Sequence, residues 1–334
     1  MRRPRVSILL PAWNAAATID SALRSIQRQT ETSWECVVID DGSDDATAEI
    51  LARFTRREAR ITAVTTRHRG LIAALTTGLQ HCTAPVIARM DADDVMLRRR
   101  LEWQLAALDR DRSLAAVGCH VRIFPRLTMT ARLREYEDWL NSLSSAKDVV
   151  RDAFVECPVA HPTLIMRREM AALGYQDREW PEDYDLVLRS LASGCRIGLV
   201  PKRLLAWRDH AHSATRSDHR YSVEQFTRCK AHYLARGFLA DVDDYVLWGY
   251  GGTGRELRRA LAAHNKHPSH IVEVKRSRIG QRIHHARVIG IADLPALGAQ
   301  RIVVSVARAG PRAIIRAALT EMGFVETRDY VCAA

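Results

Sequence analysis

Short apolar runs alternate with amphipathic stretches along the first third of the chain. The runs that predict buried strands cover residues 6–10, 35–40, 61–65 and 85–90. The stretches between them predict helices near residues 16–29, 46–57, 71–82 and 99–108. This alternation is typical of an α/β fold, in which helices cover a mostly parallel sheet.

The pattern becomes irregular after Asp109, where we expect inserted loops. Order returns with predicted strands near residues 163–166, 197–200 and 204–207 and a predicted helix near residues 183–193. A helix within residues 217–243 then precedes a new α/β pattern, whose strands are expected near residues 245–248, 271–274 and 302–306. We therefore predict three parts: a domain over 1–216, a helical connector over 217–243 and a small Rossmann-like domain over 244–334.

Three acidic clusters mark this pattern. Asp40-Asp41-Gly42-Ser43 and Asp91-Ala92-Asp93-Asp94 each follow a predicted strand, and Glu182-Asp183-Tyr184-Asp185 opens a predicted helix. Ligands of parallel sheets bind at the carboxyl ends of the strands, so the first two clusters should face one crevice. Gathered carboxylates repel each other, and a divalent metal that carries a nucleotide diphosphate would relieve this repulsion.

These clusters resemble the motifs of the family 2 glycosyltransferases. The resemblance runs from about residue 5 to about residue 216 and rests also on Val6–Asn14, on His161-Pro162-Thr163 and on Arg208-Asp209-His210. It implies the GT-A fold, a nucleotide-diphosphate sugar as donor, with a UDP-sugar favoured, and inversion of the anomeric centre. The acceptor would be a glycan or a lipid-linked sugar in envelope or surface polysaccharide synthesis.

The resemblance also implies roles for individual residues. Asp183 would be the general base. Glu182 and His161 would either contact the acceptor or support the residues of the site. The nucleotide-sugar would contact Pro11, Asn14, Asp41, Asp91 and Asp93, with Asp41 reading the base. Mn²⁺ or Mg²⁺ would be held by Asp93, Asp94 and His210.

Each of these signals has a simpler alternative. Asp-Gly-Ser occurs in ordinary turns, and acids in the first turn of a helix interact favourably with its dipole. His161 and His210 are two of 13 histidines, which need no special role at a surface.

The chain departs from the family pattern in two places. Leu75-Thr76-Thr77-Gly78 replaces a usual asparagine, and Arg98-Arg99-Arg100 stands where proline and an acid are usual. The Gln-x-x-Arg-Trp box of processive members is also missing. We therefore expect transfer of a single sugar.

A glycine-rich turn opens the predicted Rossmann-like domain. Gly249, Gly251 and Gly254 satisfy the pattern G-x-G-x-x-G between a strand and a helix, and Glu273 follows at the end of the next strand. This context is that of a dinucleotide-binding fingerprint. Three alternatives remain open: a structural or interaction domain, a site for a nucleotide or nucleotide-sugar, and a true NAD(P) site. Two other functions for the whole chain follow: a non-catalytic nucleotide-sugar-binding protein, or an NAD(P)-dependent oxidoreductase.

Composition limits the class of protein, whether membrane-spanning, secreted or cytoplasmic. The chain has 334 residues, 47% of them apolar and 27% charged, and no apolar run long enough for a membrane span or a signal peptide, so we expect a cytoplasmic protein. The seven cysteines are scattered singly, which is typical of reduced thiols.

The net charge of +11 is uneven, because residues 244–334 hold 14 Lys and Arg against 7 Asp and Glu. Aromatic residues are few, at 6% of the whole chain, which argues against a nucleic-acid-binding surface. A solvated basic face is one alternative, and the other is peripheral contact of this segment and of the run Arg98–Arg100 with the inner face of the membrane.

Overall fold

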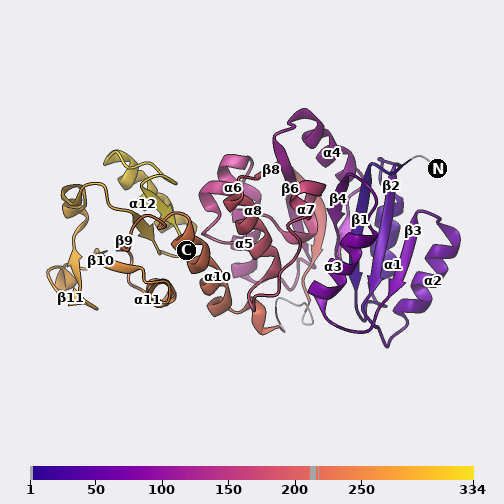
Figure 1. Ribbon diagram of the computed structural model, residues 1–334, viewed down its shortest axis with the longest axis horizontal. Coiled ribbons are helices and arrows are strands. Elements are labelled where there is room, and N and C mark those ends of the chain that lie inside the picture. Colours follow the sequence, from indigo (N-terminus) through magenta and orange to yellow (C-terminus); the bar gives the residue numbers. More distant parts are fainter. Residues whose placement is uncertain (1–2, 211–215, 217) are drawn as a thin grey trace. The chain divides into compact units, whose positions relative to one another are not determined.

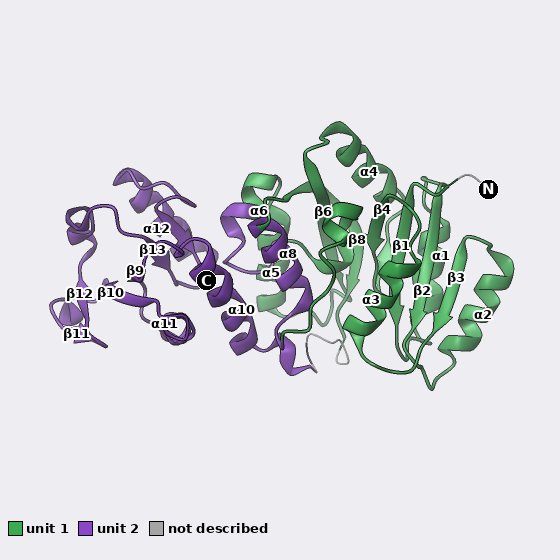
Figure 2. Ribbon diagram, viewed as in Figure 1, with its two compact units in different colours: residues 1–149, 159–178, 193–213 green, residues 150–158, 179–192, 214–334 purple. Residues whose placement is uncertain are grey.

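The computed structural model describes residues 3–210, 216 and 218–334, which form two compact units. The first unit contains residues 1–149, 159–178 and 193–213, and the second contains residues 150–158, 179–192 and 214–334 (Figure 2). Within these described ranges, no helix is long and apolar enough to cross a membrane.

An eight-stranded sheet organises the first unit, in the order β3-β2-β1-β4-β7-β6-β8-β5 (Figure 1). Its strands are β1 Val6–Ala12, β2 Trp34–Asp40, β3 Ile61–Thr65, β4 Val86–Arg89, β5 Val95–Met96, β6 Leu114–Phe124, β7 Ile165–Arg167 and β8 Arg196–Arg208. Only β7 and β5 run antiparallel to the strands beside them. The expected mostly parallel α/β fold is confirmed.

Helices cover both faces of this sheet. The helices of the first unit are α1 Ile19–Gln27, α2 Thr47–Arg57, α3 Leu71–His81, α4 Arg100–Arg110, α5 Ala131–Ser142 and α7 Arg168–Ala171, with a 3₁₀ turn η1 at His161–Thr163. Helix α6 Ala146–Asp152 begins in the first unit and ends in the second. Ile8 and Leu10 of β1 pack in one core with α1 and α2. On the other face, a Cβ at Gly78 of α3 would lie 2.1 Å from Leu9 Cδ1, so this helix approaches the sheet closely because position 78 has no side chain.

Two expectations about the middle of the chain were wrong. The segment after Asp109 is not a set of loops, because residues 114–124 form the long strand β6 and residues 131–142 form α5, capped by the Thr130 side chain. The two short strands expected near residues 197–207 are one strand, β8. Its register against β6 shifts around His120, and this irregularity accommodates Pro201, which has no backbone N–H to donate.

A six-stranded sheet organises the second unit, in the order β11-β12-β10-β9-β13-β14. Its strands are β9 Asp244–Trp248, β10 His267–Val272, β11 Arg282–Ile283, β12 Ala286–Ile289, β13 Ile302–Val304 and β14 Tyr330–Cys332. Its helices are α8 Glu182–Ala192, α10 Val223–Arg236, α11 Gly252–Ala262 and α12 Ala309–Glu321, with short turns η2 His219–Tyr221, η3 Arg276–Arg278 and η4 Ile291–Leu297. All its strands are parallel except β11.

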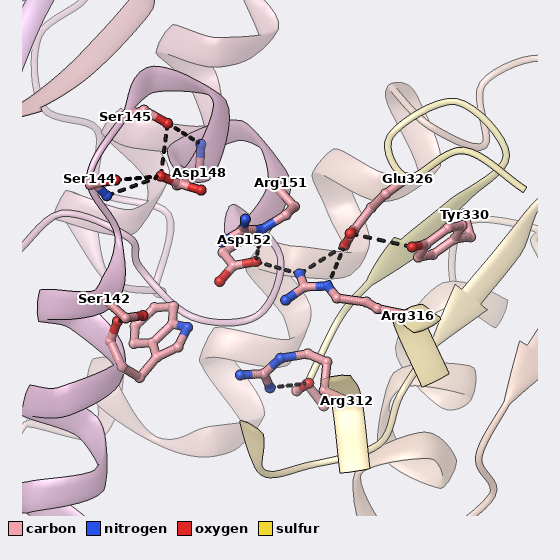
Figure 3. Close-up of polar contacts among 12 residues, drawn as sticks. Ser142, Ser144, Ser145, Asp148, Arg151, Asp152, Arg312, Arg316, Glu326 and Tyr330 are labelled. Carbon is pink, nitrogen blue, oxygen red and sulfur yellow. Dashed lines mark hydrogen bonds and ion pairs between the residues drawn. The ribbon is translucent and has the colours of Figure 1, made fainter. Parts of the chain in front are cut away.

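Polar contacts explain why residues 150–158 belong to the second unit. The buried Asp152 pairs with Arg316 of α12, which also donates to Glu326 at 2.8 Å (Figure 3). The Lys230 ammonium group donates to the carbonyl oxygen of Val155 at 3.1 Å. The predicted domain limits at residues 216 and 243 stay a prediction, and the first of them adjoins positions 211–215 and 217, which lie outside the described residues.

Candidate active site

Three carboxylates meet where β4 ends. Oxygen atoms of Asp91, Asp93 and Asp94 all lie within 4.8 Å of one another. A tight turn gathers them, since the Asp94 N–H donates to the carbonyl oxygen of Asp91 at 3.4 Å. The second predicted acidic cluster is therefore a compact group at the carboxyl end of a parallel strand.

The three carboxylates differ in their partners. Asp91 pairs with the buried Arg89, and Asp93 Oδ2 lies 2.7 Å from His210 Nε2. Asp94 is fully buried: its Oδ1 accepts the Arg208 N–H at 2.8 Å, and its Oδ2 has no hydrogen-bond partner among the described residues. Burial first, and then the charges of Asp91 and Asp93, raise the pKa of Asp94 well above its usual value.

This arrangement suits a divalent cation. Hard cations prefer carboxylate oxygens, and an ion bound here would pair the buried Asp94 oxygen that accepts no hydrogen bond from the part of the chain that the structure describes. His210, expected from the sequence to reach the metal, lies on the Asp93 side of this cluster. Asp91, expected to contact the nucleotide, belongs to the same compact group.

Two arginines that sequence reasoning did not assign support this cluster. Arg208 donates from its Nε to the carbonyl oxygen of Asp93 at 2.7 Å, in addition to its backbone contact with Asp94. Arg89 is the buried partner of Asp91. Both could have been found, because Arg208 stands two positions before His210 and Arg89 is a charged residue inside an otherwise apolar strand.

Asp41, at the end of β2, anchors a neighbouring loop. The carboxylate is buried and accepts the N–H of Gly70 at 2.7 Å and that of Arg69 at 3.1 Å, and it lies 2.9 Å from His68 Nδ1. Contacts within the protein therefore use much of the capacity of the Asp41 carboxylate to accept hydrogen bonds. Base recognition by Asp41 stays a prediction, whereas its contacts support a role in holding residues 68–70 in place.

Pro11 and Asn14 shape the same edge. Pro11 is buried within β1, and Asn14 has a left-handed backbone with φ 49°. The Asn14 N–H donates to Ser43 Oγ at 2.9 Å, and its side-chain oxygen accepts the Asp44 N–H at 3.0 Å. Asn14 therefore connects the loop after β1 to the loop after β2.

Trp13 is a residue of this edge that sequence reasoning missed. Its side chain is 55% exposed and stacks on His68, with ring centroids 4.5 Å apart. The sequence feature that could have identified Trp13 is a large aromatic residue immediately after a buried strand. Its second face can take a flat ring such as a base.

The third acidic cluster opens α8 and belongs to the second unit. Glu182 is buried and accepts the Tyr221 hydroxyl at 2.9 and 2.8 Å. Asp185 is also buried and accepts from Trp180 Nε1 at 3.0 Å and from the Tyr233 hydroxyl at 2.7 Å. Asp183 alone of the three is partly exposed, and its Oδ1 accepts the Tyr184 N–H at 2.7 Å. Its role as general base stays a prediction.

His161 lies in the interior of the first unit. Its Nε2 is 2.8 Å from the Tyr175 hydroxyl, and burial, followed by the charge of Arg89, lowers its pKa well below the usual value. These surroundings favour the supporting role over direct contact with an acceptor.

The run Arg98–Arg100 is not the continuous basic surface that a membrane contact would need. Arg100 is fully buried and donates to the carbonyl oxygen of Arg89 at 2.9 Å and to Gln104 Oε1 at 2.9 Å. Arg99 pairs with Glu102 on the same helix. The expectation that this whole run faces a membrane is therefore corrected for Arg100. Its side chain instead contacts the last residue of β4, two positions before Asp91.

Comparison with known sequences places this fold and these motifs in one family. The sequence profile described as Glycosyl transferase family 2 matches residues 7–173, which is half of the chain. The chain belongs to glycosyltransferase family 2. The predicted resemblance and the prediction of a glycosyltransferase are both confirmed.

Individual family 2 relatives agree with this assignment. The amylovoran biosynthesis glycosyltransferase AmsE of Erwinia amylovora is 26% identical over 205 residues, which are 60% of this chain and 74% of AmsE. TarS of S. aureus in complex with UDP-GlcNAc has a similar structure, with TM-score 0.55 and 14% identity over 78% of this chain and 71% of that one. The mannosyltransferase PcManGT of Pyrobaculum calidifontis in complex with GDP-Man and Mn²⁺ has TM-score 0.53 and 17% identity over 97% and 82%. At these identities the solved structures show the GT-A fold.

Proposed function

We propose that this family 2 glycosyltransferase moves one sugar, with inversion, from a nucleotide-diphosphate sugar to a glycan or lipid-linked acceptor in surface polysaccharide synthesis. The observation that carries the proposal is a buried Asp94 oxygen in a three-carboxylate cluster, for which residues 3–210, 216 and 218–334 provide no hydrogen-bond partner. AmsE, named for amylovoran biosynthesis, supports the polysaccharide context. Neighbours that bind UDP-GlcNAc and GDP-Man support a nucleotide-sugar donor, and we favour a UDP-sugar.

Asp93, Asp94 and His210 would hold Mn²⁺ or Mg²⁺. Such an ion neutralises the charge that develops on a departing nucleoside diphosphate. Arg89 holds Asp91 beside this group, where its carboxylate can contact the nucleotide. The exposed ring of Trp13 and the loop that Asp41 anchors supply a surface for the base.

Asp183 would take the proton of the acceptor hydroxyl. Inverting transfer needs one base on the acceptor side, and the partial exposure of Asp183 leaves this carboxylate able to receive a proton. Glu182, fixed by the Tyr221 hydroxyl, supports the first turn of the helix that carries Asp183.

Labelled UDP- and GDP-sugars with Mn²⁺ test this function. We expect Mn²⁺-dependent donor binding and slow donor hydrolysis without acceptor, both lost in Asp94→Asn and retained in Asp138→Asn, a change at an exposed acid of α5. A protein that binds no nucleotide at any Mn²⁺ concentration contradicts the proposal. Donor binding without turnover on any acceptor would instead indicate a non-catalytic nucleotide-sugar-binding protein.

A further inference from the structure

The glycine-rich turn of the second unit lies where a doubly wound sheet binds ligands. From the central strand β9 the chain proceeds to β10 and β12 on one side, and later returns to β13 and β14 on the other. Ligands of such sheets bind outside the carboxyl ends of the strands where this reversal occurs, here between β9 and β13. Residues 249–254 follow β9 at that point, and residues 305–308 follow β13.

Two of the glycines are needed by the turn itself. Gly249 has φ 97°, and a Cβ there would lie 2.5 Å from Val306 Cγ2. A Cβ at Gly254 would lie 2.1 Å from the carbonyl oxygen of Gly249. Both positions therefore exclude a side chain for reasons internal to the fold.

The fold imposes no such requirement for glycine at positions 251 and 252. A Cβ at either position would meet no atom within 4 Å, and Gly251 has φ −76°, which any residue can adopt. The fold would accept side chains here. Glycine at both positions instead leaves open space in front of the backbone, as the close approach of a phosphate requires.

The backbone at this point is suited to an anion. Helix α11 has 11 residues and begins at Gly252, and no side chain caps its first turn. The first N–H groups of a helix have no intrahelical partner and point outward at the positive end of its dipole. Phosphates bind to such termini.

Ser305 provides an independent sign of a ligand. Its side chain is only 3% exposed, and its hydroxyl oxygen has no hydrogen-bond partner among the described residues. The Ser305 Cβ lies 3.9 Å from the Cβ position built on Gly254, and its carbonyl oxygen accepts the Thr253 hydroxyl at 3.3 Å, so the serine lies against the glycine-rich turn. A buried hydroxyl without a partner is destabilising, and an oxygen of a bound ligand would supply that partner.

The contacts of the acid that follows β10 favour a diphosphate over a complete dinucleotide. Arg308, an exposed residue in the loop after β13, precedes α12. Glu273, the acid expected for ribose recognition, already accepts the Val274 N–H at 3.0 Å and lies 3.2 Å from Arg278 Nη1. Its carboxylate is therefore engaged by its own chain, whereas the phosphate-binding features are open.

We propose that the second unit binds the diphosphate group of a nucleotide over Gly251 and Gly252, with the Ser305 hydroxyl as a donor to a phosphate oxygen. This site lies in a different unit from Asp91, Asp93 and Asp94. Because backbone N–H groups and a hydroxyl hold the phosphates, binding requires no divalent ion.

Calorimetric titration of the full chain in EDTA tests this site, with UDP, UDP-GlcNAc, ADP, NAD⁺ and NADP⁺ as probes. We expect at least one probe to bind at one equivalent, and to bind equally well to the Asp93→Asn, Asp94→Asn double variant. Gly251→Val should weaken this binding at least about tenfold, because its methyl groups occupy the phosphate space. Ala263→Val, at the exposed other end of α11, is the matched control and should bind as the wild type does.

Ser305→Ala separates a ligand-binding role from a structural one. We expect affinity to fall about tenfold, as for the loss of a hydrogen bond to a charged group, while the melting temperature of the unliganded protein does not fall. The ranking of the five probes identifies the source of the diphosphate. The proposal is overturned if no probe binds in EDTA at millimolar concentration, or if binding survives in both Gly251→Val and Ser305→Ala.

Discussion

Single residues of the acidic motifs differ in what surrounds them. Asp91 and Asp185 have arginine partners, Glu182 accepts a tyrosine hydroxyl, and Asp41 accepts backbone N–H groups. Asp94 has one buried oxygen that accepts no hydrogen bond within the described part of the chain. The partners decide which carboxylates stabilise the fold and which remain able to bind a cation or a substrate.

Asp183→Asn should abolish transfer while leaving donor binding intact. A general base contributes about 10²–10⁴ in rate, so we expect kcat to fall by that factor with an unchanged donor Kd. Steady-state kinetics and donor titration measure the two quantities. Asp177→Asn, at an exposed acid shortly before the motif, should leave both unchanged. If Asp183→Asn transfers sugar at the wild-type rate, Asp183 is not the general base of the reaction.

His161 should make stability fall in mild acid. Burial keeps its folded-state pKa well below the ordinary value near 6.5, so below about pH 6.5 the unfolded chain binds a proton that the folded chain does not. The free energy of unfolding should therefore decrease as pH falls, by up to about 1.4 kcal/mol per pH unit.

Urea unfolding at several pH values measures this slope. We expect a shallower slope below pH 6.5 in His161→Gln than in the wild type. His81→Gln, at an exposed histidine of α3, controls for the loss of one imidazole. Equal slopes in the wild type and both variants would show that His161 is not kept neutral by the fold.

Secondary-structure elements place these residues through their ends. The loops after β1 and β2 are joined by Asn14, the loop after β4 gathers three acids, and the end of β8 supplies Arg208. In the second unit, the ion pair of Asp152 with Arg316 holds residues 150–158 to α12 (Figure 3).

Asp152→Asn should destabilise the second unit by about 2 kcal/mol. Removing one partner of a buried ion pair costs about 3–5 kcal/mol, and Arg316 recovers part of this through Glu326. Burial opposes ionisation of Asp152, but hydrogen bonds from Arg151 and Arg316 outweigh it and hold the pKa of Asp152 below its usual range. Its stabilising effect is therefore present at neutral pH and lost as pH falls through the folded-state pKa.

Urea unfolding at pH 7 and at pH 3 compares Asp152→Asn with the wild type. The difference between the two proteins should shrink at the lower pH, because the Asp152 carboxylate of the unfolded wild-type chain, with its ordinary pKa near 3.9, takes up a proton there. Asp241→Asn, at an exposed acid of the same unit, should unfold as the wild type does. An equal loss of stability in both variants would show that the Asp152 ion pair is not responsible.

The charge of the whole molecule bears on where it works. The net charge is +11, and residues 244–334 contribute +7 of it, from 14 Lys and Arg against 7 Asp and Glu. Arg98–Arg100 adds less free charge than the sequence indicates, because Arg100 is buried. Any membrane attraction should therefore come mainly from residues 244–334.

Vesicle sedimentation measures this attraction. Each basic residue near an anionic surface contributes about 1 kcal/mol, so we expect the protein to sediment with anionic vesicles at low salt. High salt should release it, because screening shortens the range of these charges to a few ångströms. Neutral vesicles are the control. Protein that stays in the supernatant with anionic vesicles at low salt would favour a soluble acceptor.

Much of this architecture followed from local pattern. Strand–helix alternation predicted the elements of the first 110 residues except the two-residue strand β5, since buried parallel strands are continuous apolar runs and their covering helices are amphipathic. The acidic motifs stand in order at strand and helix ends, which sufficed for the family. Prediction failed for residues 114–142, which form β6 and α5 and not loops, and it divided β8 into two strands. Both β6 and β8 mix charged and apolar residues because part of each strand is exposed.

The tertiary structure alone decided how each candidate residue is paired. The sequence by itself determined that acids, glycines and a histidine stand at the ends of elements, because turn and helix-end chemistry is local. Whether Asp41 is engaged, whether Arg100 is buried and whether Ser305 lacks a partner depend on residues far away in the chain. Burial and long-range hydrogen bonding arise only when the strands are assembled into a sheet.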